Sequence, residues 1–190
     1  MPKPVSRPRI TVEAYLEGEK VATERHVFIN GEVVAMTGAS KMHNRLTRRL
    51  ARLFDDRLAG GPCEAFGTDV KVRITTLNDD RFYYPDLHVE CAPLTPHEYY
   101  SERPVLILEV LSESTERGDR SDKFYAYRRL PSLMEYVLVA QDAYRVEIYR
   151  RATDWDLEVY GERQRFHLAA LDGELSVDDI YRDILPPSSP

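Results

Sequence analysis

The chain has few of the features that define membrane and disulfide-stabilised proteins. Its 190 residues contain only two cysteines, Cys63 and Cys91, which provide neither a disulfide framework nor the ligand spacing of a zinc site. This favours a reduced, cytoplasmic protein. No segment approaches the roughly 18 apolar residues that span a bilayer, and the first residues lack the apolar core of a signal peptide. No contact with a membrane is therefore expected.

The sequence also lacks an excess of positive charge. It has 26 basic and 32 acidic residues, for a formal net charge of −6, which argues against a protein that coats nucleic acid. A local basic patch can still bind a polyanion. No internal repeat, low-complexity tract or domain boundary is visible. We expect one domain over residues 11–185, between a flexible segment (1–10) and a tail (186–190).

Turn and capping residues predict the elements of the first half. Thr11 is a helix cap, and Asn30-Gly31 between two apolar runs is a strong hairpin signal. These signals predict, in order, a helix over residues 12–19, a hairpin of strands 26–29 and 32–36, a long helix over 40–58, one alternating strand over 65–74 and another over 82–91.

The second half is expected to be richer in strands. The apolar run Val105–Leu111 is typical of a buried central strand. Further predictions are a short helix in the loop up to residue 100, a helix over 115–130, hairpins of strands 133–140 with 144–151 and 155–160 with 165–168, and a short helix or coil over 180–185. This order predicts an α/β fold, a mixed sheet flanked by helices with extra N- and C-terminal hairpins.

Glu109 interrupts the apolar run 105–111. An ionised carboxylate in a buried strand is costly unless another group compensates its charge. A second acid, Asp86, lies in the preceding strand segment. Two carboxylates on neighbouring strands can hold a hard cation such as Mg²⁺, with the backbone carbonyl of Val110 as a further ligand. A metal-dependent enzyme is therefore the first hypothesis.

The next helix provides a basic group for this site. A common nuclease arrangement has lysine two residues after the second acid, but Leu111 stands there. Asp119, Lys123 and Tyr127 follow at i, i+4 and i+8, so Lys123 would reach back towards Glu109 and either orient the attacking water or stabilise the transition state. The same spacing also fits a surface ion pair between Asp119 and Lys123.

Two N-terminal residues are weaker candidates. His43 lies at the start of the long helix on its apolar, sheet-facing side, where it would contact a phosphate or carry a proton. A buried structural histidine fits the same position. Glu32 would add a carboxylate from the hairpin, or serve only as a hairpin residue.

The long helix has two contrasting faces. Its apolar stripe consists of Leu46, Leu50, Leu53, Phe54 and Leu58. The opposite face carries Arg45, Arg48, Arg49 and Arg52. This basic face predicts either contact with nucleic acid or a solvated surface.

Taken together, these motifs resemble the Uma-two family of restriction endonucleases, within the PD-(D/E)XK nuclease superfamily. The resemblance covers about residues 11–185. The motifs are residues 29–32, 38–44, 67–72, Tyr84-Pro85-Asp86, 109–115, 119–124 with Tyr127, and 133–139. By position, Asp86 and Glu109 match the metal-binding acids, and Lys123 matches a displaced lysine. Glu32 and His43 match recurrent N-terminal positions.

The resemblance implies a restriction-endonuclease-like fold, dependence on Mg²⁺ or Mn²⁺ and hydrolysis of DNA phosphodiester bonds. We expect a homodimer, because cleavage of both strands needs two sites. One alternative is a catalytically weak or inactive nuclease-fold protein that binds nucleic acid or a protein partner, which Leu111 and the acidic total charge favour. Another is a nuclease for RNA or for branched or damaged DNA.

Overall fold

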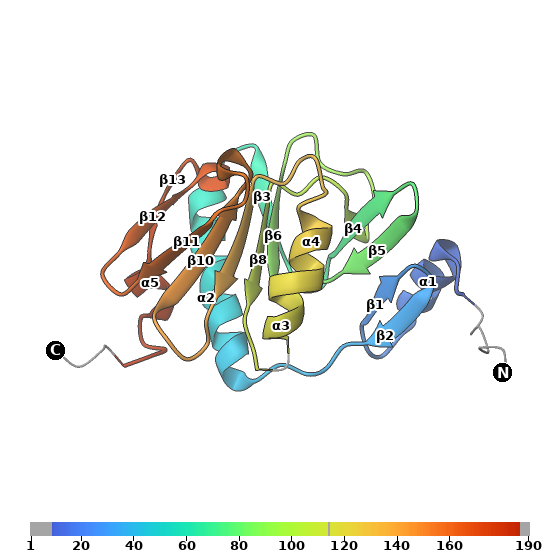
Figure 1. The fold of residues 1–190 in the computed structure, drawn as a ribbon, viewed down its shortest axis with the longest axis horizontal. Helices are drawn as coiled ribbons and strands as arrows, with labels where there is room; N and C mark the ends of the chain where they lie inside the picture. The colour runs from blue at the N-terminus through green and yellow to red at the C-terminus, as the bar shows by residue number, and fades with distance from the viewer. Residues whose placement is uncertain (1–8, 114, 187–190) are drawn as a thin grey trace.

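The strands of the protein form three sheets in a computed structural model (Figure 1). The structure describes residues 9–113 and 115–186. The predictions for residues 1–8 and 187–190 lie outside the described residues. Ile10, at the end of the segment predicted to be flexible, donates its backbone N–H to the Gly31 carbonyl at 3.0 Å.

The largest sheet has six strands in the order β11-β10-β9-β8-β6-β3. Strands β8 and β9 are parallel, and the other neighbours are antiparallel. The predicted mixed sheet is therefore confirmed. Its strands are β3 (Cys63–Gly67), β6 (Leu87–Cys91), β8 (Leu106–Val110), β9 (Glu135–Val139), β10 (Arg145–Arg150) and β11 (Leu157–Gly161).

A second sheet has five strands in the order β2-β1-β5-β4-β7, and a third is the hairpin β12-β13. Helix α1 packs on the five-stranded sheet through an aromatic cluster of Tyr15, Phe28, Phe82 and Tyr100. The strands are β1 (His26–Ile29), β2 (Glu32–Ala35), β4 (Lys71–Thr76), β5 (Asp79–Tyr83), β7 (Tyr100–Ser101), β12 (Arg165–Leu168) and β13 (Gly173–Ser176).

Helices cover both faces of the six-stranded sheet. One face is covered by α2, and the other by the continuous helical segment α3-η1-α4, in which η1 is a π-helical turn (Figure 1). The helical elements are α1 (Val12–Glu19), α2 (Lys41–Leu58), α3 (Glu116–Gly118), η1 (Asp119–Lys123), α4 (Phe124–Tyr127), η2 (Arg151–Thr153), η3 (Ala169–Leu171) and α5 (Val177–Tyr181). None of the helices in the described residues is long and apolar enough to cross a membrane.

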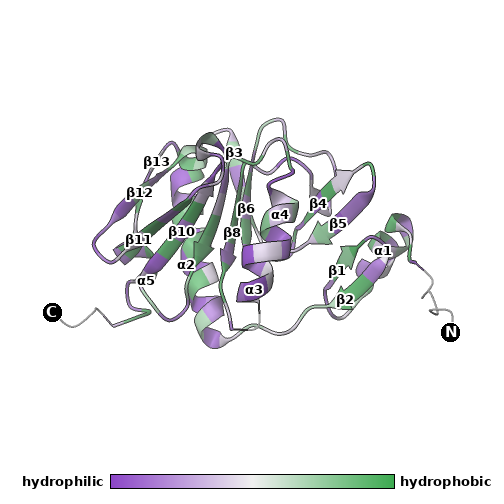
Figure 2. Ribbon diagram, viewed as in Figure 1, coloured by the Kyte–Doolittle hydropathy of each residue, from purple (hydrophilic) through white to green (hydrophobic). Residues whose placement is uncertain are grey.

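Strand β8 divides the hydrophobic core into two layers. Leu106, Leu108 and Val110 pack in the cluster that contains the predicted apolar stripe of α2. The alternate residue Ile107 packs with Phe124 and Tyr127 on the opposite face. Figure 2 shows the apolar character of the central strands and the mixed character of α2. Glu109, which alternates with Leu108, consequently faces the α3-η1-α4 segment.

The capping and turn signals of the first half are confirmed. Thr11 Oγ1 accepts from the Ala14 N–H at 3.2 Å, and Ser40 Oγ accepts from the His43 N–H at 3.0 Å. Asn30 and Gly31 both have positive φ, as the hairpin turn requires. A Cβ atom on Gly31 would lie 2.7 Å from Arg9 Cβ, so only glycine fits at this position.

Two long strands were predicted wrongly. The segment 65–74 forms β3 and β4, which belong to different sheets and are separated by a turn closed by Val70 N–H and the Gly67 carbonyl. The segment 82–91 forms β5 and β6, and Pro85 interrupts it because proline has no N–H for the strand ladder. Between β3 and β6 the chain therefore enters and leaves the five-stranded sheet.

Three further predictions are also wrong. The loop before β7 contains no helix. The predicted hairpin of 155–160 with 165–168 does not form, because β11 pairs with β10 and β12 pairs with β13. Cys63 and Cys91, opposite each other in the β3–β6 ladder, form a disulfide. The cysteines therefore no longer support a cytoplasmic location, which stays a prediction.

Candidate active site

The two predicted acids lie at the same end of neighbouring strands. Strands β6 and β8 are antiparallel, and Leu87 pairs with Leu108. Continued by one residue, this register sets Asp86 opposite Glu109. Residues that are opposite in an antiparallel pair have their Cβ atoms about 5 Å apart. The fold therefore brings the two carboxylates together.

Asp86 is held by one backbone and one side-chain group. Its Oδ2 atom accepts the Val110 N–H at 2.7 Å and lies 3.0 Å from His43 Nε2. The prediction that His43 points towards the sheet is thus confirmed. Its imidazole connects the first turn of α2 to the end of β6, so both elements fix the orientation of the Asp86 carboxylate.

Glu109 is buried against the other helical layer, with 4% of its side chain exposed. Lys123 Nζ lies 3.0 Å from Glu109 Oε1, and the Tyr127 hydroxyl donates to the same oxygen at 3.3 Å. The predicted approach of Lys123 to Glu109 is confirmed. Lys123 Nζ also lies 2.8 Å from Asp119 Oδ1. Because only 1% of the Asp119 side chain is exposed, this pair is not a surface ion pair.

The charges in this cluster do not balance. Burial raises the pKa of Glu109, the positive charge of Lys123 opposes this, and Asp119 and Asp86 raise the pKa further. Burial alone would lower the pKa of Lys123, but the carboxylates of Glu109 and Asp119 outweigh it and raise the pKa. Lys123 thus contacts two of three neighbouring carboxylates, Glu109 and Asp119 but not Asp86, and this excess of negative charge is what a cation would relieve.

Asp119 and Lys123 begin and end the π-helical turn. Such turns are rare and occur often at functional sites, as single wide turns inside α-helices. The Asp119 carbonyl accepts from the Tyr136 hydroxyl at 2.9 Å, which ties the turn to β9. Although Lys123 lies close to Asp119 Oδ1, the contact lacks hydrogen-bond geometry, so this buried oxygen has no hydrogen-bond partner among the described residues.

Comparison with known proteins identifies the family. The family model Uma2, described as "Putative restriction endonuclease", matches residues 12–178. The chain belongs to the Uma2 family. Two uncharacterised proteins of Synechocystis sp. are similar: slr1290 is 34% identical over 93% of this chain and 94% of its own length, and sll1609 is 39% identical over 80% and 89%.

A solved structure shows the same fold. It is a crystal structure from Anabaena variabilis, described as "a putative nuclease belonging to DUF820", with a TM-score of 0.74 and 16% identity over 93% of this chain and 99% of that chain. The restriction-endonuclease-like α/β fold is therefore confirmed. At this identity the similarity concerns the fold alone.

Two positions that the Uma2 resemblance emphasises lie outside the cluster. Glu32 is exposed on β2, in the five-stranded sheet, and among the described residues no hydrogen bond or ion pair joins it to the two acids or to Lys123. Leu111, where the superfamily has lysine, is buried in the layer of Phe124 and Tyr127. The lysine that approaches Glu109 in this structure is Lys123, on the helical segment.

One residue near the site, Gln141, was not predicted from the sequence. Its Nε2 donates to the Leu111 carbonyl at 2.6 Å, and its Oε1 accepts from Ser40 Oγ at 2.8 Å. Gln141 thus links the residue after β8 to the cap of α2, and so helps to fix the two elements that carry Glu109 and His43. Its position just beyond β9 has no motif that reveals this contact.

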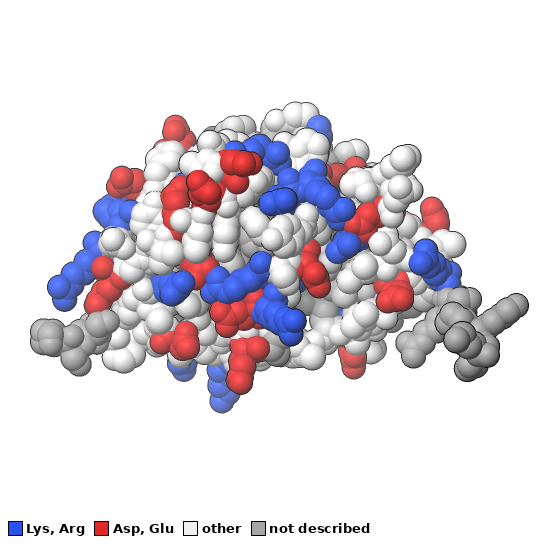
Figure 3. Space-filling view, viewed as in Figure 1, with Lys and Arg blue, Asp and Glu red and all other residues white. Residues whose placement is uncertain are grey.

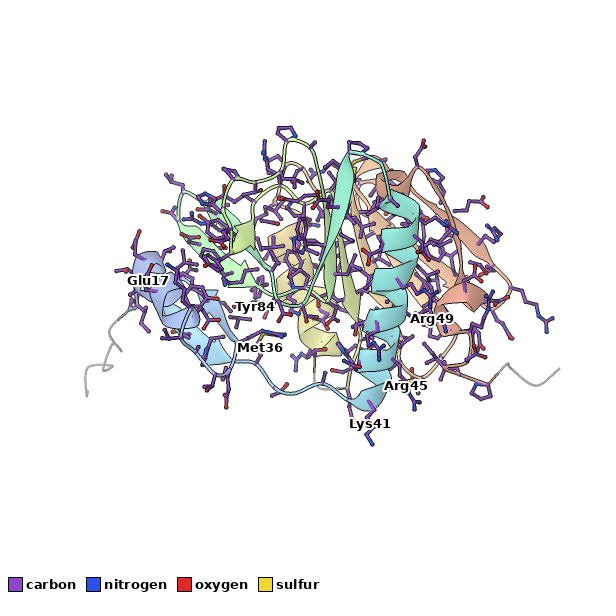
Figure 4. All side chains as sticks on the ribbon, turned by 180° about the vertical axis from the view of Figure 1, so that it is seen from behind. Glu17, Met36, Lys41, Arg45, Arg49 and Tyr84 are labelled. Atoms are coloured by element: carbon purple, nitrogen blue, oxygen red, sulfur yellow. A yellow bond between two sulfur atoms is a disulfide. The ribbon has the colours of Figure 1, made fainter. Side chains whose placement is uncertain are left out.

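The four arginines of α2 lie on its outer face, away from this cluster. Arg45, Arg48 and Arg52 are exposed, and Arg49 donates to the Arg182 carbonyl at 3.0 Å. Figure 4 shows Arg45 and Arg49 projecting from α2, with Lys41 at its start. The predicted opposition of apolar and basic faces is confirmed.

The residues at the site fit a hard divalent cation. Within the described residues, no three side chains of the His, Cys, Asp and Glu types form a metal-binding group. Mg²⁺ does not need one, because it commonly binds one or two carboxylates together with water and substrate phosphates. Asp86 and Glu109 supply two carboxylates, and Asp119, whose Oδ1 lies 2.8 Å from Lys123 Nζ, adds a third negative charge nearby.

Proposed function

We propose that the protein is a Mg²⁺-dependent endonuclease that hydrolyses phosphodiester bonds of DNA. The observation that carries this proposal is the arrangement of Asp86 and Glu109 at one end of β6 and β8 with Lys123 against Glu109. The family description and the fold support a nuclease. The further assignment to DNA and to Mg²⁺ is our own.

The metal ligands would be the carboxylates of Asp86 and Glu109 and the backbone carbonyl of Val110. All are hard oxygen donors, which suit Mg²⁺ and also accept Mn²⁺. When bound, the cation would polarise the scissile phosphoryl group and acidify water. His43 would act as a positioning residue, because its imidazole contacts the Asp86 oxygen that also accepts the Val110 N–H.

Lys123 would supply the positive charge of the usual strand lysine. In hydrolysis, a water oxygen forms a bond to phosphorus while the bond from phosphorus to the leaving sugar oxygen breaks, and negative charge grows on the phosphoryl oxygens. An ammonium group fixed by Glu109 and Asp119 would stabilise that charge. The attacking water would release a proton to solvent, and the leaving oxygen would take one up from solvent.

Cleavage of supercoiled plasmid tests this function. Purified protein would be incubated with Mg²⁺, Mn²⁺ or EDTA, beside the Asp86→Ala and Glu109→Gln variants. We expect metal-dependent nicking by the unchanged protein and none by either variant. Glu24→Gln, which removes an exposed carboxylate, is the control and should cleave normally. Nicking that persists in EDTA or in both variants would contradict the proposed metal ligands.

The buried Leu111 favours one alternative, a nuclease-fold protein that binds nucleic acid or a protein partner with little or no catalysis. This alternative predicts no hydrolysis with either metal, even when the protein binds the substrate. A panel of duplex DNA, single-stranded DNA, branched DNA and RNA, assayed with Mn²⁺, separates it from an enzyme with a different nucleic-acid substrate.

We also infer a homodimer. Strand β11 is the edge of the six-stranded sheet and exposes Leu157 and Val159 by 49% and 48%. An exposed apolar edge strand is a ready template for pairing with another chain. Light scattering after gel filtration should give the mass of two chains, and Val159→Lys should give that of one. A monomer for the unchanged protein would exclude the dimer.

A further inference from the structure

A basic groove lies on the outer side of α2, between this helix and the segment that follows α5. Its volume is about 630 Å³. Five arginines line it: Arg45, Arg48, Arg49 and Arg52 from the helix, and Arg182 from the opposite wall. The bond from Arg49 to the Arg182 carbonyl connects the two walls. The groove is separate from the acid cluster, because none of its lining residues belongs to that cluster and its four arginines on α2 lie on the face that points away from the sheet.

The helical arginines of the groove have no acidic partners. Among the described residues, none of the four forms an ion pair, whereas Arg182 pairs with Asp179. Elsewhere the basic residues are commonly neutralised: Arg120 pairs with Glu147, and Arg150 with Glu135. The face in Figure 3 accordingly shows basic and acidic side chains interspersed. The unneutralised charge on α2 is therefore available to an external anion.

The spacing of the arginines suits a chain of phosphates better than a single one. Residues 45, 48, 49 and 52 occupy i, i+3, i+4 and i+7, so their guanidinium groups form a row along one face of the helix. The row spans about 10 Å at 1.5 Å per residue, which is long enough to contact more than one phosphate of a nucleic-acid strand. The guanidinium group matches phosphate geometry through paired N–H donors.

The remaining lining residues are consistent with a sugar–phosphate backbone. Leu53 and Ile184 are partly buried and offer apolar surface. Asp56 and Asp183 add two negative charges, which leaves the groove positive against five arginines. A protein partner with an acidic surface would need a larger apolar surface than Leu53 and Ile184 provide.

We infer that this groove binds the sugar–phosphate backbone of the nucleic-acid substrate outside the scissile bond. The inference rests on the proposed function for the identity of the ligand. Helix α2 provides the connection to the catalytic cluster, because His43 in its first turn contacts Asp86 and Arg45 lies two residues further on the outer face. A strand leaving the acids around the start of α2 would meet Arg45 first.

Binding in EDTA tests the inference without requiring catalysis. A short fluorescein-labelled DNA duplex would be titrated by anisotropy at several salt concentrations, with the unchanged protein, Asp86→Ala, the double variant Arg48→Glu/Arg52→Glu and the control Arg9→Glu/Arg128→Glu. The control reverses two exposed arginines away from the groove and has the same net charge. Circular dichroism would confirm that each variant is folded.

We expect the groove variant to lose about tenfold or more in affinity, and the slope of log affinity against log salt to fall by about 2, since each phosphate contact contributes about 0.9. The control should bind as the unchanged protein does, and Asp86→Ala should bind at least as tightly, because it removes a negative charge from the proposed site. Equal losses in the groove and control variants, or no binding by the unchanged protein, would overturn the inference.

The same proteins assayed on plasmid with Mg²⁺ separate this inference from the proposed function. If DNA binding depends on the groove but the unchanged protein does not cleave, the proposed nuclease function is refuted and the proposed role of the groove stands. If the groove variant binds and cleaves DNA as the unchanged protein does, the proposed role of the groove is refuted and the proposed nuclease function stands.

Discussion

Lys123 and Glu109 form a buried ion pair that joins the π-helical turn to the central strand, with Nζ 3.0 Å from Oε1. Removal of one partner from such a pair leaves an uncompensated charge and is strongly destabilising. Lys123→Met should therefore lower the free energy of unfolding by about 3 kcal/mol. In the double variant Lys123→Met/Glu109→Gln, the loss of stability should be smaller than the sum of the two single losses by about 1 kcal/mol or more. The reason is that the effects of substituting two groups in contact are not additive.

Urea unfolding of the four proteins of this cycle measures the coupling. Lys41→Met, which removes an exposed lysine from α2, is the matched control and should change stability by less than about 0.5 kcal/mol. Strict additivity of the two substitutions would show that the pair contributes nothing to the fold.

Lys123 should affect the rate of hydrolysis more than the affinity for metal. If its ammonium stabilises developing charge, Lys123→Met should lower kcat on the order of a hundredfold. The affinity for Mn²⁺, measured by isothermal titration calorimetry, should stay within a few-fold, because the carboxylates remain. Parallel losses of rate and metal affinity would instead indicate that Lys123 acts by holding Glu109 in place.

His43 should act through Asp86. Groups that orient a metal-binding carboxylate typically contribute about 10- to 100-fold to metal affinity or activity. We expect His43→Leu to lower the affinity for Mn²⁺ by this factor while the urea midpoint stays close to that of the unchanged protein. His43→Gln, which retains a hydrogen-bond donor, should recover part of the loss. His167→Gln, at an exposed position, controls for the removal of a histidine.

His88 should make the stability of the fold dependent on pH. Burial lowers the pKa of its imidazole from 6.5 to about 4, although the charge of Glu90 opposes this. Between these two values the unfolded chain binds a proton that the folded chain does not. The contribution of neutral His88 to stability is therefore fully present above about pH 6.5 and is lost as the pH falls towards 4.

From pH 7 to pH 5 this loss should reach about 2 kcal/mol, at about 1.4 kcal/mol per pKa unit. Urea unfolding at both pH values measures it. His88→Gln should show a smaller decrease than the unchanged protein, whereas His167→Gln should show the same decrease. An equal pH dependence in all three proteins would exclude His88 as its source.

Local sequence patterns predicted the approach of the catalytic candidates well. The spacing of Asp119, Lys123 and Tyr127 requires only helical geometry, and the position of His43 on the apolar face of α2 follows from the same periodicity. The strand alternation around Glu109 likewise gave the correct face. Each of these inferences depends only on the periodicity of a single helix or strand.

Relations between elements were harder to predict. The division of residues 65–74 between two sheets depends on a short turn that lacks glycine at its centre, so alternation appeared to continue through it. The Cys63–Cys91 disulfide and the bridge of Gln141 depend on strand pairing over a distance in sequence. The edge strand β11 was assigned a wrong partner for the same reason.

The π-helical turn has a consequence for how the site could be switched. A π-helical turn contains one residue more than an α-helical turn. If it rearranged into a regular α-helical turn, the residues after the turn would rotate by about 100° relative to the residues before the turn. Lys123 would then leave Glu109 without any loop having to open. The hydroxyl of Tyr136 on the Asp119 carbonyl opposes that change. The distance between the charges of Lys123 and Glu109 thus depends on the number of residues per turn in this one helical segment.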